Sequence, residues 1–176
     1  MILGAVLAGG GSTRFGSDKA LALLDGRTLL ARATDTLAVF TDTVVVVGRT
    51  IASVACLPDW PEPGLGPLGG IAAALRHAGL NGFDQVLTCG VDSAQLPDNL
   101  LALLGPAPAY LADQPVIGLW PAYALPAISA ILAGQGRHSM RAFADAIGAR
   151  AVHPPSLSAN INTPADLAAL EHRNGL

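Results

Sequence analysis

The chain has 176 residues, of which 51% are apolar and 13% are charged, and its formal net charge is −3. This length suffices for one domain with a substantial core, and we expect a single domain over residues 1–176. The acidic balance argues against nucleic acid as a partner, because proteins that bind phosphate backbones usually carry a basic face.

We expect neither a membrane span nor a secretory leader. The first charged residue is Arg14, so the apolar start lacks the basic region of a signal peptide. The longest uncharged stretch, residues 114–136, is interrupted by three prolines. The two cysteines, Cys56 and Cys89, match no metal spacing, and we expect them to be reduced and buried in a cytoplasmic protein.

Strands alternate with helices along the chain, which predicts right-handed βαβ units and a mainly parallel sheet. The strands are continuously aliphatic, so both faces of the sheet should be covered. The predicted strands are 2–7, 42–48, 84–92, 114–120 and 149–153. The predicted helices are 28–40, 68–78, 96–104, 128–132, 139–147 and 164–173.

Three unusual features follow the first three predicted strands: a glycine-rich loop, the tripeptide "GRT" and Asp92. Ligands of open α/β sheets bind at the carboxyl ends of the strands. We therefore expect these features to lie together and to form a ligand site.

The loop "GGGSTRFGSDK" after the first strand matches neither common phosphate-binding motif. Ser17 and Asp18 separate Gly16 from Lys19, so it is not a P-loop, and Arg14 stands where a dinucleotide fingerprint needs glycine. Glycines nevertheless let backbone N–H groups approach phosphate oxygens, and Arg14 and Lys19 can neutralise the charge. The alternative is a tight strand-to-helix turn with solvated cations.

Three further features each allow two interpretations. Asp92 suits Mg²⁺ that also bridges phosphates, or it caps the helix predicted from residue 96. The loop 59–70 either presents free N–H groups at a helix start or is a plain connection. Asn160 and Asn162 precede a helix that we expect Thr163 to cap, and local capping explains one of them but does not require both.

These segments, in order, resemble the molybdenum cofactor guanylyltransferases. The opening "LAGGGSTRFGSDKALALLDGRTLL" is similar to the family's LAGG-x-S-x-R-[MF]-G-x-DK signature, and "NINTPADL" to its N-[IV]-NTP-x-[DE]-L. The looser matches are "PDWPEPGLGPLGGIAAAL", "CGVDSAQLP" and "QPVIGLWP". The resemblance covers nearly the whole chain and implies an α/β, three-layer, Rossmann-like nucleotidyltransferase fold with a mostly parallel central sheet.

The resemblance also implies the activity: GTP and Mg²⁺ react with molybdopterin to give its guanine dinucleotide form and pyrophosphate. It implies Arg14, Lys19 and Asp92 as the catalytic set, with the two cations on the phosphates and Asp92 on Mg²⁺. Asp59 would help to hold the nucleoside. The remaining implied contacts are Leu7, Ala8, Gly9 and Gly10 along the nucleotide, and Asn160 and Asn162 facing the reacting phosphates, with Asn162 as a second metal contact.

The sequence departs from the family pattern at several positions. Val91, Ala94 and Gln114 replace the usual Cys, Pro and His, and "VVVVGRT" lacks an Asn that some members have. The alternatives are therefore a related enzyme that uses CTP or acts on a sugar phosphate or another phosphorylated alcohol, and a nucleotide-binding module without turnover. The resemblance further implies transient contacts with cofactor-synthesis or molybdoenzyme-maturation proteins.

Overall fold

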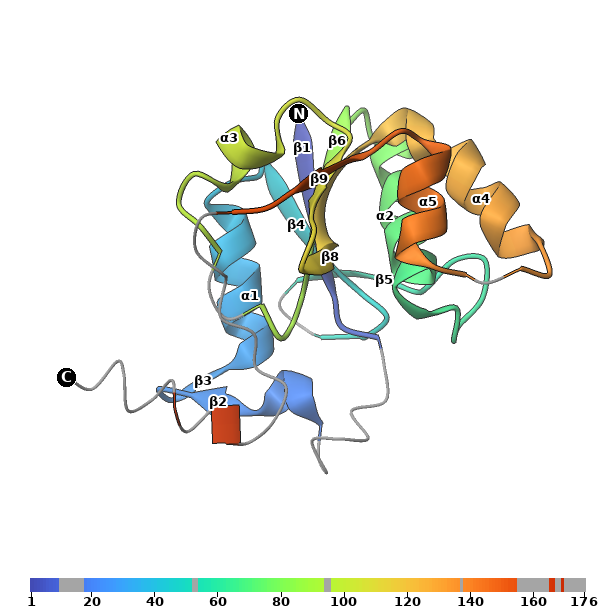
Figure 1. The fold of residues 1–176 in the computed structure, drawn as a ribbon. Coiled ribbons are helices and arrows are strands. Elements are labelled where there is room, and N and C mark those ends of the chain that lie inside the picture. The colour runs from blue at the N-terminus through green and yellow to red at the C-terminus, as the bar shows by residue number, and fades with distance from the viewer. Residues whose placement is uncertain are drawn as a thin grey trace.

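The computed structural model describes residues 1–9, 18–51, 54–93, 96–136 and 138–154, together with residues 165, 166 and 169. Its centre is a seven-stranded sheet with helices on both faces (Figure 1). The strand order is β5-β4-β1-β6-β8-β7-β9. The strands are β1 (Ile2–Leu7), β4 (Thr43–Val47), β5 (Ala55–Leu57), β6 (Gln85–Gly90), β7 (Ala109–Leu111), β8 (Gln114–Pro121) and β9 (Arg150–Val152).

The sheet is mostly parallel, as the alternation of strands and helices predicts. β5, β4, β1 and β6 run parallel, and β9 is parallel to β7. β8 runs antiparallel to both of its neighbours, β6 and β7, so the sheet is mixed. A separate hairpin of β2 (Leu23–Leu24) and β3 (Arg27–Thr28) lies beside the first helix.

Helices cover the two faces of the sheet in two groups (Figure 1). One face carries α1 (Leu29–Ala38) and α3 (Leu100–Leu104). The other carries α2 (Gly66–Leu80), α4 (Leu125–Ala133) and α5 (Met140–Ala146). The described residues also contain two short 3₁₀ helices, η1 (Lys19–Leu21) and η2 (Ala122–Ala124).

The hydrophobic core is split by the sheet into two clusters, because alternate residues of a strand point to opposite faces. In β1, Leu3 and Ala5 pack toward α2, whereas Val6 packs toward α1. Trp120 is fully buried, stacks on Tyr110 and donates a hydrogen bond from Nε1 to Thr88 Oγ1 at 2.9 Å. The prediction that both faces are covered is confirmed.

Several predicted boundaries differ from the observed ones. The third strand ends at Gly90 rather than at residue 92, because a turn closes there with Ser93 N–H donating to Gly90 O. The helix predicted over 96–104 begins only at Leu100, after a turn in which Leu100 N–H bonds Pro97 O. The helix predicted over 128–132 is longer, since Pro126 is accommodated in the first turn of α4.

Two predictions remain partly or wholly outside the described residues. Thr163, the expected cap, is not described, and of the closing helix predicted over 164–173 only residues 165, 166 and 169 are. Within the described part of the chain, no helix has the length and apolar character needed to cross a bilayer.

Candidate active site

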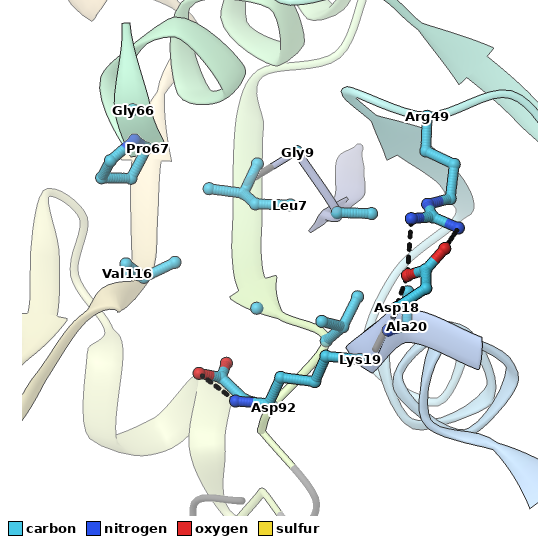
Figure 2. A pocket seen from close by; sticks show the side chains of 13 residues that line it. Leu7, Gly9, Asp18, Lys19, Ala20, Arg49, Gly66, Pro67, Asp92 and Val116 are labelled. Atoms are coloured by element: carbon cyan, nitrogen blue, oxygen red, sulfur yellow. Dashed lines mark hydrogen bonds and ion pairs between the residues drawn. The ribbon is translucent and has the colours of Figure 1, made fainter. Parts of the chain in front are cut away.

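The ends of three adjacent strands lie level at one edge of the sheet. Leu7, the last residue of β1, pairs with Val47 at the end of β4 and with Gly90 at the end of β6. A cavity of about 410 Å³ opens there, a volume typical of small-molecule sites. Figure 2 shows its walls, which come from the end of β1, from η1, from the turns after β4 and β6, from the start of α2 and from β8. Of the three unusual features, the described residues Gly9 and Lys19 of the glycine-rich loop, Arg49 of "GRT" and Asp92 line this cavity, whereas residues 10–17 of that loop lie outside the described residues.

Two glycines let β1 and β4 meet backbone to backbone beside the cavity. Gly48 has φ +81°, and a Cβ on it would lie 2.6 Å from Gly9 Cα. Gly48 N–H also donates to Leu57 O at 2.9 Å, which ties the turn to β5. Position 48 requires a positive φ and leaves no room for a Cβ, and only glycine satisfies both requirements. The edge of the sheet nearest the cavity therefore consists of backbone atoms without side chains.

Lys19 and Asp92 form an ion pair on one wall of the cavity (Figure 2), with Nζ 3.5 Å from Oδ2. The Lys19 side chain is 13% exposed and that of Asp92 34% exposed, so both can reach a ligand in the cavity. Lys19 is held by η1, which Asp18 caps by accepting a hydrogen bond from Ala20 N–H at 3.2 Å. A cation and a carboxylate therefore face each other where parallel strands end.

Asp92 is positioned by the turn after β6 and not by the helix that follows. The cap of α3 is Asn99, so the interpretation of Asp92 as a helix cap is wrong. Its carboxylate lies against Gly90, where a Cβ would clash with Asp92 Oδ1. Gly90 thus provides the space for this carboxylate, a role that was not predicted from the sequence although Gly90 lies only two residues before Asp92.

Asp59 lies in the loop between β5 and α2, next to the contact between Gly9 and Gly48. Its carboxylate oxygens lie 3.3–3.6 Å from the positions that a Cβ would occupy on Gly9, Gly48 and Gly70. Burial raises the pKa of this carboxyl group. It has no hydrogen-bond or ion-pair partner among the residues that the structure describes, so it is a partly desolvated acceptor beside the strand ends.

The partner of Arg49 was not predicted from the sequence. Arg49 Nη1 lies 2.6 Å from Asp18 Oδ2, and Nη2 donates to Asp18 Oδ1 at 2.7 Å (Figure 2). This pair lowers the pKa of the Asp18 carboxyl group, mainly through the hydrogen bond. Arg49 is part of "GRT", so the position was noticed, but no local motif connects it to a residue 31 positions earlier.

Not every predicted site residue can be placed. The structure brings Leu7, Ala8, Gly9, Lys19 and Asp92 to one cavity, with Asp59 alongside. Gly10, Arg14, Asn160 and Asn162 lie outside the described residues. Within the described residues, no group of three or more His, Cys, Asp or Glu side chains could hold a metal ion by itself.

A bare backbone edge, a lysine and an aspartate at strand ends suit a nucleoside triphosphate, whose phosphates need cations and whose nucleoside needs a flat, accessible edge. Residues 4–153 match the MobA-like NTP transferase domain. The chain belongs to this family. It is therefore a nucleotidyltransferase, and the predicted activity class is confirmed.

Molybdenum cofactor guanylyltransferases from other organisms align with almost the whole chain. The molybdenum cofactor guanylyltransferase of Acidiphilium cryptum is 37% identical, over 94% of this chain and 92% of its own length. That of Rhodobacter capsulatus is 36% identical, over 98% of this chain and 96% of its own.

Solved structures confirm the fold. The molybdopterin-guanine dinucleotide biosynthesis protein A of Archaeoglobus fulgidus superposes with a TM-score of 0.80 at 22% identity, covering 99% of each chain. The 2-C-methyl-D-erythritol 4-phosphate cytidylyltransferase of Thermus thermophilus superposes with a TM-score of 0.65 at 18% identity, over 100% of this chain and 98% of its own. The Rossmann-like nucleotidyltransferase fold predicted from the sequence is thereby confirmed.

Proposed function

We propose that this protein transfers GMP from GTP to molybdopterin, which forms the guanine dinucleotide cofactor and releases pyrophosphate. The observation that carries the proposal is the Lys19–Asp92 pair, which faces the cavity at the strand ends of a MobA-like transferase. Similarity to curated guanylyltransferases over more than nine-tenths of the chain supports GTP as donor and molybdopterin as acceptor. We also propose that residues 1–176 form one domain that acts in the cytoplasm.

In this reaction a phosphate oxygen of molybdopterin attacks the α-phosphorus of GTP. The new P–O bond forms as the bond between the α-phosphorus and the bridging oxygen to the β-phosphate breaks, and pyrophosphate leaves with that electron pair. The two reactants are anions, so the protein must align them and offset their charge. Lys19 faces the phosphates, and we expect Arg14, Asn160 and Asn162 to contribute on the same side.

The residues present fit a magnesium ion. Mg²⁺ is usually held by one or two carboxylates together with substrate phosphates and water, and Asp92 is a carboxylate that reaches the cavity. Asp92 would hold the ion, with Asn162 as a second contact. When bound, the ion supplies positive charge to the phosphate oxygens during transfer. Lys19, already 3.5 Å from Asp92, would turn its ammonium group toward the same oxygens.

Guanine selection would rest mainly on the backbone at the end of β1. Ala8 N–H is already donated to Val47 O at 2.9 Å, so Ala8 can offer the base only its carbonyl oxygen. A carbonyl suits guanine, which presents N1–H and an amino group as donors, whereas adenine has an acceptor at N1. Asp59, whose carboxylate lies beside Gly9, would accept a further hydrogen bond from the nucleoside.

Incubation of the purified protein with molybdopterin, Mg²⁺ and an equimolar mixture of the four ribonucleoside triphosphates tests this function by mass analysis of the products. We expect the guanine dinucleotide to dominate. A predominant cytosine dinucleotide would make the enzyme a cytidylyltransferase. Absence of any dinucleotide would contradict molybdopterin as the acceptor.

A further inference from the structure

The Asp18–Arg49 ion pair joins the phosphate-facing segment of the site to the rigid edge of the sheet. Arg49 follows Gly48, and Gly48 is tied to β5 through Leu57 O and packs against the backbone of Gly9. The base of the Arg49 side chain is therefore fixed by the sheet. Its guanidinium binds both carboxylate oxygens of Asp18, the geometry in which an Arg–carboxylate pair is strongest and most directional.

Asp18 in turn controls the next residue, Lys19. The same carboxylate that Arg49 binds accepts a hydrogen bond from Ala20 N–H and so caps η1, of which Lys19 is the first residue. Of the three residues of this turn only Ala20 is buried, and Leu21 is 54% exposed. Its backbone bonds are local: Leu21 N–H donates to Asp18 O and Ala22 N–H to Lys19 O. Isolated 3₁₀ turns have poor hydrogen-bond geometry and little stability of their own. The position of the Lys19 ammonium group thus depends on the Asp18 carboxylate as well as on the ion pair with Asp92.

The Arg49 side chain is directed inward rather than into solvent. It is 25% exposed, and its Nε is buried without an acceptor among the residues that the structure describes. In an ion pair on the open surface, the Nε–H group of the arginine would be hydrated, because burying an unpaired N–H group costs free energy. By contrast, the Arg27–Asp35 pair is 57% and 56% exposed and lies away from the cavity, so it provides a matched comparison.

We propose that Arg49 is a positioning residue that holds Asp18 and thereby fixes Lys19 at the phosphate side of the cavity. The inference rests on the proposed function, since it assumes that a triphosphate is the ligand. Arg49 acts here through two other side chains and does not itself touch the reacting atoms. Its removal should therefore impair the handling of phosphates and leave the binding of the nucleoside unchanged.

A double-mutant cycle tests the connection. We expect Arg49→Gln and Asp18→Asn each to lower kcat/KM for GTP by about 10- to 100-fold, because small misplacements of a catalytic group have effects of this size. The double variant should be no worse than either single one, and Arg49→Lys should recover part of the loss. Effects that multiply in the double variant, or an Arg49→Gln variant as active as the wild type, would overturn the proposal.

Guanosine and GTP separate positioning of Lys19 from direct contact with the base. With guanosine as a competitive inhibitor, Arg49→Gln should leave its inhibition constant unchanged, while the dissociation constant of GTP measured by calorimetry rises. Equal weakening of both ligands would show that Arg49 contacts the nucleoside and would overturn the proposal.

The melting temperature without ligand should change no more in Arg49→Gln than in the comparison variant Arg27→Gln, which should keep full activity. A loss of fold in Arg49→Gln alone would assign Arg49 a merely structural role and overturn the proposal. Failure of the proposed function is recognised separately, because then the wild-type protein itself would neither bind GTP nor transfer GMP.

Discussion

Lys19 and Asp92 are 73 positions apart in the chain and 3.5 Å apart in space. Replacing Lys19 by alanine should lower kcat/KM for GTP by about 10- to 100-fold, since a charge-assisted hydrogen bond contributes roughly 1.5–3 kcal/mol. The melting temperature of the free protein should change little, because the pair is partly open to solvent. Steady-state kinetics and thermal unfolding check both expectations. Near-normal turnover at saturating GTP would contradict a role for Lys19 on the phosphates.

Asp59 offers a prediction about stability and pH. Its pKa in the folded protein lies above the ordinary value of 3.8, because burial disfavours the charged form. Between 3.8 and the folded pKa, the folded state binds more protons than the unfolded state, so stability falls as pH rises through this window. Above the folded pKa the cost is fully present, and below 3.8 it is absent.

Asp59→Asn removes this charge with little change in shape. We expect the variant to melt at a higher temperature than the wild type at about pH 7, and this gain to shrink as the pH is lowered through the window. We expect the same variant to bind GTP more weakly, because the nucleoside loses a charged acceptor. Thermal unfolding across a pH series, with and without GTP, measures both effects. A variant that is less stable than the wild type at neutral pH would contradict the account.

At the scale of elements, the turn after β6 depends on Gly90. An alanine there would push its Cβ into Asp92 Oδ1 and displace the carboxylate from the cavity wall. We expect Gly90→Ala to lose most of its activity while it still folds, since Gly90 lacks a positive φ. The matched control is Gly79→Ala in α2, where a Cβ meets open space.

Gly79→Ala should keep its activity and gain about 0.4–1 kcal/mol of stability, because alanine favours the helix and restricts the unfolded chain. Activity assays and denaturant unfolding measure the activity and the stability of both variants. Full activity in Gly90→Ala would show that the placement of Asp92 does not depend on the space above this glycine.

The longer elements and the short strand β9 could be predicted from the sequence, whereas the short strands β2, β3, β5 and β7 could not. Long aliphatic runs such as β1 and β6 are recognisable because both of their faces are buried. β5 and β7 have three residues each, and β2 and β3 have two, too few for a period to appear. The antiparallel direction of β8 was not predicted either, since burial of a strand does not depend on its direction.

At the scale of the whole molecule, the topology assembles the site from segments that are distant in the chain. The strand-end position of Asp92 was readable from the sequence, because it directly follows an apolar run, and Lys19 was singled out by the glycine-rich loop that leads to it. Their contact, and the pairing of Arg49 with Asp18, depend on how loops fold over the sheet edge. No local pattern in the sequence encodes contacts of this kind.

The central claim is that this cavity supports attack on the α-phosphorus of GTP. Its most direct test follows the isotopic label of GTP during a single turnover with molybdopterin and Mg²⁺, in the wild type and in Asp92→Asn. We predict that an α-phosphate label appears in the guanine dinucleotide, that a γ-phosphate label is released as pyrophosphate, and that Asp92→Asn does neither while it melts near the wild-type temperature. A γ label transferred to the acceptor, or full transfer by Asp92→Asn, would contradict the account.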